Sequence, residues 1–142
     1  MNVREQIFAA IKTALQTSTN IKVVERNILP FEHISSVQFP ICQIEDLGDS
    51  AIEYKTGGIA AITMNVNFKL IVKAEYKDNA TLLNNADADV VKILGNNEKL
   101  GGLVSIMMIE NREQLDIETT YPYVAVIRTA KVIYTASTNS GF

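Results

Sequence analysis

The sequence predicts a single α+β domain in which two helices pack on one face of a mostly antiparallel sheet. Three observations support this class. Two segments carry apolar residues at helical spacing, one long segment alternates between apolar and polar residues, and neighbouring strand segments are close enough to form hairpins. With 142 residues, 47% of them hydrophobic, the chain suits one continuous core, so we expect one domain spanning 1–142.

Two amphipathic helices are expected. In residues 3–17 apolar side chains recur three or four positions apart, and charged residues occupy the rest of the helical wheel. The second helix carries an apolar stripe over 82–94 and begins after Asp78 or Asn79, either of which can cap the first turn. We expect Gly95 to end this helix in a left-handed conformation.

The clearest strand is 59–76, where every even position from Ile62 to Ala74 is apolar and most odd positions are polar. This alternation is typical of a strand buried on one face. Shorter strands are expected at 21–28, 39–46, 103–109 and 121–136. Between and after them we expect a loop at 29–38, an acidic connection at 110–120 and a flexible tail at 135–142.

The alternating strand is too long for a compact domain of this size. A 142-residue globule is about 37 Å across, whereas an unbroken strand over 59–76 would run about 59 Å at ~3.3 Å per residue. Either the strand bends at a bulge, at Ala60-Ala61 or Lys73-Ala74, or its end projects as a hairpin arm with 47–56 as the second strand.

A projecting hairpin exposes an edge and a tip that need a neighbour to bury them, which is typical of an assembly device. The candidate assembly interface is therefore the tip of this hairpin, namely Glu53, Tyr54, Lys55, Gly57 and Gly58.

The charge distribution argues against tight nucleic-acid binding, because the net charge is −3 and such binding relies on clustered Lys and Arg. Carboxylates concentrate in 41–58 and 104–120, each with a net charge of −3. These segments are either solvated acidic loops or surfaces for charge-complementary self-association.

No constellation of residues predicts catalysis, so we expect no enzymatic activity, cofactor or metal. His33 has no HxH or HExxH partner, and Cys42, the single cysteine, lies in an apolar segment that would keep its thiol unreactive. Neither Gly-Gly pair has the pattern of a phosphate-binding loop. Asp87 and Asp89 point to different sides of the second helix, and we expect both to be solvated surface residues.

Other features place the chain inside the cell and away from membranes. One cysteine cannot form an intramolecular disulfide, residues 1–20 lack the apolar stretch of a signal peptide, and no run approaches the ~18 apolar residues of a membrane span.

With catalysis unsupported, the layout of the chain becomes informative, and it resembles the tail terminator (tail completion, minor tail protein) family of long-tailed phages over nearly its whole length. The order and spacing of the elements carry this resemblance: the helix at 3–17, the strand start Phe39-Pro40-Ile41-Cys42 before the acidic Glu45-Asp46, the alternating strand ending in Val72, the second helix followed by Leu100-Gly101-Gly102-Leu103-Val104, and the run from Tyr123 to Tyr134.

The resemblance implies a structural protein of the virion tail, made in the cytoplasm of the host bacterium. It would form a hexameric ring that caps the tail tube, stops its polymerisation and provides the surface for head joining. The implied partners are further copies of the chain, the tail tube protein and a head-completion or connector protein, with DNA passing through the lumen. An acidic lumen would repel phosphates, and the candidate lumen residues are Glu45, Asp46, Asp49, Glu110, Glu113 and Asp116.

The sequence leaves two alternative functions open. The chain could be a head–tail connector or completion protein on the head side of the same joint. It could also be a small cytosolic ligand-binding or enzymatic α+β domain that uses a pocket between helices and sheet, with His33 or Cys42 near it.

Overall fold

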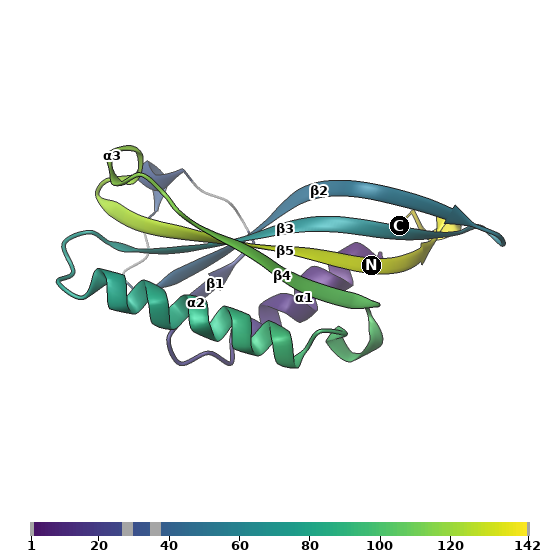
Figure 1. The fold of residues 1–142 in the computed structure, drawn as a ribbon, viewed down its shortest axis with the longest axis horizontal. Coiled ribbons are helices and arrows are strands. Elements are labelled where there is room, and N and C mark those ends of the chain that lie inside the picture. The colour runs from purple at the N-terminus through teal and green to yellow at the C-terminus, as the bar shows by residue number, and fades with distance from the viewer. Residues whose placement is uncertain (1, 27–29, 35–37, 142) are drawn as a thin grey trace.

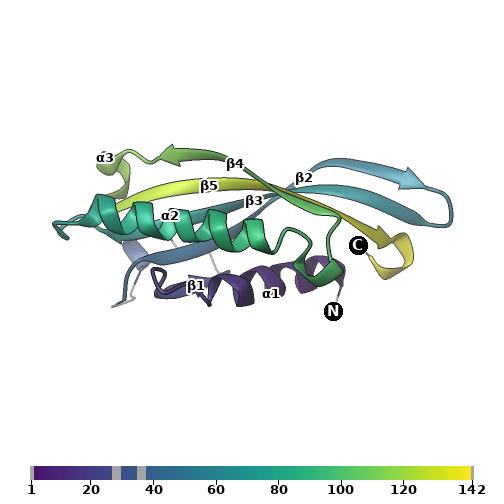
Figure 2. The same ribbon diagram turned by 60° about the horizontal axis from the view of Figure 1, so that its bottom comes forward.

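The computed structural model describes residues 2–26, 30–34 and 38–141 and shows helices α1 and α2 on one face of a five-stranded sheet (Figures 1 and 2). The strand order is β1-β2-β3-β5-β4, and all pairs are antiparallel except β1 with β2. The predicted α+β class is confirmed. The strands are β1 (Val23–Glu25), β2 (Ile41–Lys55), β3 (Ile59–Lys73), β4 (Ile106–Gln114) and β5 (Tyr123–Ser137). The helices are α1 (Val3–Leu15), α2 (Asn79–Asn96) and the short α3 (Ile117–Thr120), with 3-10 turns η1 (Phe31–His33), η2 (Leu100–Gly102) and η3 (Thr138–Ser140).

Helix α1 ends two residues before the predicted boundary. At its start, the side chain of Asn2 accepts a hydrogen bond of 2.9 Å from the Glu5 backbone N–H. At its end, the Thr17 hydroxyl donates to the Ala14 carbonyl, and the Ser18 hydroxyl accepts from the Ile21 backbone N–H. These side-chain bonds replace the helical pattern and turn the chain toward β1.

The predicted second helix is present as α2, but its ends are not capped as the sequence predicts. Asp78 occupies the N-cap position without a side-chain hydrogen bond, and Asn79 donates to the Ala74 carbonyl instead. The expectation for Gly95 is wrong, because the helix continues through it to Asn96 and its φ is not positive. The Asn97 side chain, which donates to the Ile93 carbonyl at 2.8 Å, closes the last turn in its place.

The alternation in β3 is confirmed: even positions from Ala60 to Val72 are buried toward the helices, although the strand ends at Lys73 rather than at residue 76. The bulges lie elsewhere than expected. Strand β3 pairs with β5 without a shift, whereas β2 is bulged between Asp46 and Gly48 and again between Asp49 and Ala51. The long hairpin therefore bends in its outer strand.

The β2–β3 hairpin also projects, since its turn extends beyond both helices in Figure 2. We call residues 47–60 the arm; they comprise the outer ends of β2 and β3 and the turn between them. The arm is braced rather than loose, because Ile59 pairs with Ser137 of β5 and the Gly58 carbonyl accepts a 2.7 Å hydrogen bond from the Thr138 N–H.

Several other boundaries differ because strand pairing extends into polar segments, whereas β1, expected over 21–28, spans only Val23–Glu25. Strand β4 starts three residues later than expected and includes 110–114 of the acidic connection, because its backbone pairs with β5. Strand β5 and η3 include residues 135–140 of the expected flexible tail. Of the expected loop at 29–38, residues 29 and 35–37 lie outside the described residues, and Phe31–His33 form η1.

Candidate functional site

The predicted interface residues lie at the arm tip, where all of them are exposed. Gly57 and Gly58 have φ angles of 79° and 73°, a left-handed conformation that tight hairpin turns require and that other residues adopt only with strain. Tyr54, just before the turn, is 69% exposed. The structure therefore brings Glu53, Tyr54, Lys55 and the two glycines together, as the sequence predicts; their role in assembly stays a prediction.

Apolar surface is concentrated on the arm. Within the described parts of the chain, its exposed large apolar side chains are Leu47, Ile52, Tyr54 and Ile59. Ile52 and Tyr54 share one face of β2, because side chains alternate along a strand, and Glu53 and Lys55 share the other. The arm tip thus has an apolar face, and a charged face on which Ile59, the cross-strand partner of Lys55, is also exposed.

The sheet has free edges at both sides within the described residues. Strand β1 pairs with β2 only as far as Gln43, so the outer edge of β2 beyond that point has no strand beside it. Strand β4 forms the opposite edge. Unpaired backbone N–H and C=O groups on such edges are suited to pairing with another chain.

The six candidate lumen residues do not form one patch. Glu45, Asp46 and Asp49 lie on β2, whereas Glu110 and Glu113 lie on β4, with β3 and β5 between them. Asp116 accepts a hydrogen bond from the Glu118 N–H and caps α3. The roles of these residues toward a lumen stay a prediction.

Two of these carboxylates are already paired within the molecule. The Arg4 guanidinium of α1 donates to both carboxylate oxygens of Asp46, at 2.7 and 2.6 Å, and to Asp49 at 2.7 Å. The hydrogen bonds from Arg4 lower the pKa of the Asp46 carboxyl below its ordinary value of 3.8. Arg4 therefore ties the N-terminal helix to the base of the arm and offsets the charge of one of these two carboxylates.

Replacing Arg4 with methionine should lower the free energy of unfolding by about 1 kcal/mol near neutral pH, since these ion pairs are partly exposed. The folded pKa of Asp46 is depressed, so its stabilising contribution is present above 3.8 and is lost as the pH falls through the folded value. Urea titrations of both proteins across the acid range check this. A difference that stays constant down to the most acidic pH would contradict it, and Lys92→Met on the exposed side of α2 is the matched control.

A cluster of charged residues that the sequence analysis missed lies where α2 crosses the sheet. Asp87 is 4% exposed, and Arg128 of β5 donates to its two carboxylate oxygens at 2.9 and 2.6 Å. Arg112 of β4 adds a 3.4 Å contact to the same carboxylate and a 2.6 Å bond to the Asn84 side chain. The expectation that Asp87 is a solvated surface residue is wrong.

Asp89 is half-buried and accepts hydrogen bonds from Ser18 and Asn20.

The described residues show little that could act as a catalytic nucleophile or metal site. Cys42 is fully buried, and burial raises the pKa of its thiol to about 12, while His33 is exposed on η1. Across 2–26, 30–34 and 38–141, no three His, Cys, Asp or Glu side chains gather as metal ligands. In the same residues, no helix has both the length and the apolar character needed to cross a membrane.

The Cys42 thiol should react with Ellman's reagent at least about a thousandfold more slowly in the folded protein than in guanidinium at about pH 8, because a thiol with a raised pKa carries little thiolate. The absorbance of the released thiol measures both rates. Comparable rates in the two conditions would show that Cys42 is accessible.

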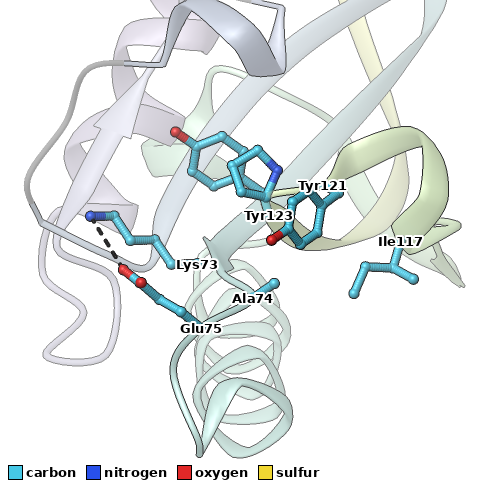
Figure 3. Close-up of a pocket in the computed structure, with 7 residues that line it drawn as sticks. Lys73, Ala74, Glu75, Ile117, Tyr121 and Tyr123 are labelled. Atoms are coloured by element: carbon cyan, nitrogen blue, oxygen red, sulfur yellow. Dashed lines mark ion pairs between the residues drawn. The ribbon is translucent and has the colours of Figure 1, made fainter.

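A cavity of about 630 Å³ opens at the end of the molecule where β3 finishes and α3 lies (Figure 3). Figure 3 shows Lys73 and Glu75 on one side of it and Ile117 and Tyr121 on the other. Ile117 and Tyr121 are 46% and 74% exposed, and the Lys73 ammonium lies 3.9 Å from the Glu75 carboxylate. The cavity therefore has a charged wall and an apolar wall. Ala74, Pro122 and Tyr123 complete its lining.

Comparison with known proteins gives little. No family model matches the chain, and no curated protein matches it. One solved structure to which it is similar is a chain of the virion of the native gene transfer agent (GTA) particle, with 11% sequence identity, a TM-score of 0.47, and coverage of 95% of this chain and 92% of that one. A likeness of this size supports no conclusion about what the present chain does.

Proposed function

We propose that the chain is a structural protein of a tailed phage or phage-like particle that caps the tail tube as a ring. In this role it stops polymerisation of the tube and provides the surface to which the head joins. The observation that carries the proposal is the arm, a braced hairpin that extends beyond the helices with apolar side chains on its surface.

Monomeric proteins rarely keep a projecting hairpin with several exposed apolar side chains and an open strand edge, because such surfaces associate. The arm lies at one end of an elongated molecule, and in the proposed ring it contacts a surface of a different kind on a neighbouring copy. Contacts of this type repeat from copy to copy and close into a ring where the rotation permits. The choice of a tail terminator, and of six copies, rests on the resemblance in element order.

Size-exclusion chromatography with light scattering, together with negative-stain microscopy, should show rings, alone or on the ends of tail tubes. Tyr54→Ser should raise the concentration at which half of the chains are assembled at least tenfold, because buried tyrosines at interfaces commonly contribute more than ~1 kcal/mol. Its fold should be unaffected, since Tyr54 is 69% exposed in the monomer.

The matched control is Val91→Ser, which removes an exposed apolar side chain from α2, away from the arm. It should assemble like the wild type. A wild-type chain that remains monomeric and neither caps nor binds tail tubes would contradict the proposal. Binding to portal-side proteins with no binding to tubes would favour the head–tail connector role.

A further inference from the structure

The cavity beside α3 lies at the opposite end of strand β3 from the arm. The arm turn precedes β3 at Ile59, and the cavity lies where β3 ends at Lys73. These residues are 14 apart on one unbroken strand, about 46 Å at ~3.3 Å per residue. The arm of a chain cannot reach its own cavity, so any contact between them joins two copies.

We propose that this cavity is the acceptor for the arm tip of the neighbouring copy, an inference that rests on the proposed ring assembly. A hairpin tip that enters end-on presents the two faces of its strand to opposite walls. The apolar face, Ile52 and Tyr54, then contacts Ile117 and Tyr121.

The charged faces are also complementary. Glu53 and Lys55 stand two residues apart on the arm, and Lys73 and Glu75 stand two residues apart on the opposite wall of the cavity. Glu53 then pairs with Lys73, and Lys55 pairs with Glu75. The present Lys73–Glu75 ion pair is long, at 3.9 Å, and partly exposed, so exchanging this pair for the new contacts costs little. The Lys73 ammonium also lies 5.5 Å from the centre of the Phe39 ring, a contact that the docked arrangement has to keep or replace.

The cavity has the right size for this occupant. Its volume of about 630 Å³ lies within the range that holds a compact group of a few side chains. Ile117 and Tyr121 are largely exposed in the single chain, and so are Tyr54 and Lys55, so docking buries apolar area on both partners. The contact is head-to-tail, as a closed ring requires.

Charge exchange tests the pairing without changing the net charge. The arm variant is Glu53→Lys with Lys55→Glu, and the cavity variant is Lys73→Glu with Glu75→Lys, which keeps the ion pair within the chain in reversed form. Each should raise the concentration for half-assembly about tenfold, because two attractions become two repulsions. The chain that carries all four changes should return to within about threefold of the wild type.

The control exchanges an exposed pair elsewhere, Glu98→Lys with Lys99→Glu, and should assemble normally. A second measurement mixes two variants that each carry one added cysteine besides Cys42, Tyr54→Cys and Ile117→Cys, under oxidising conditions. A cross-linked dimer that forms in the mixture faster than in either variant alone is expected, and buried Cys42 does not interfere.

The outcomes separate this inference from the ring proposal. Rings that tolerate both exchanges, or a four-residue variant that does not recover, overturn the cavity as acceptor and leave ring formation standing. A wild-type chain that stays monomeric with and without tail tubes overturns both.

Discussion

Replacing Phe68 with alanine should lower the free energy of unfolding by about 3–5 kcal/mol, the range for removing a fully buried aromatic side chain. Phe68 is 0% exposed and lies at the centre of β3, between Ile44 of β2 and Arg128 of β5. Its ring points toward the helices, where a close-packed core cannot collapse around the missing volume. Denaturant titration measures the loss, and the folded far-UV spectrum should be retained.

The matched control is the preceding residue. Asn67 lies on the opposite face of the same strand, where no long helix covers the sheet (Figure 2). Asn67→Ala should cost less than about 1 kcal/mol, a typical value for a partly exposed substitution. A loss well below 1 kcal/mol for Phe68→Ala would mean that the inward face of β3 is assigned incorrectly.

The sequence predicts this part of the fold well because a single physical rule governs it. Strand β3 is central, so one side meets the helices and the other does not, and period-two alternation follows directly. The same holds for α1, whose buried face follows from its helical spacing. These patterns are local and can be found without knowledge of the tertiary structure.

Boundaries set by long-range pairing were not predictable in the same way. The polar residues 47–55 continue as a strand because β3 runs beside them, and 110–114 do so because β5 runs beside them. The sequence offers 47–56 as the second strand of a hairpin arm only as one of two alternatives, and it predicts an acidic connection for 110–120. The candidate site also has one part that the sequence predicts and one part that it does not. The arm tip follows from Gly57-Gly58, whereas the cavity combines side chains from 73–75, 117 and 121–123, which no local pattern joins.

One missed feature left a signal in the sequence. Asp87 lies four residues after Leu83 and three before Val90, so it falls on the buried stripe of α2. Arg128 occupies an inward position of β5 between Val126 and Ala130. An inward carboxylate on a helix and an inward guanidinium on the strand beneath it indicate a buried ion pair, because neither charge is stable there alone.

Replacing Asp87 with alanine should lower the free energy of unfolding by about 3 kcal/mol, the lower end of the range for removing one partner of a buried ion pair. The substitution leaves Arg128, whose side chain is 17% exposed, beside Arg112, its cross-strand neighbour, with the shared carboxylate gone. The value falls at the lower end because Arg112 is 35% exposed and can turn toward water. Denaturant titration measures the loss, and Asp78→Ala at the exposed start of α2 should stay within about 0.5 kcal/mol of the wild type.

A compensating substitution separates charge from packing. In Asp87→Leu with Arg128→Met, both members of the main pair become apolar, and much of the lost stability should return because no buried charge lacks a partner. Arg128 also donates a 2.9 Å hydrogen bond to the Glu110 carbonyl beside the bulge of β4, so some loss should remain. If the double variant is no more stable than Asp87→Ala, the cluster stabilises the protein by fixing β4 against α2 and not by neutralising Arg128.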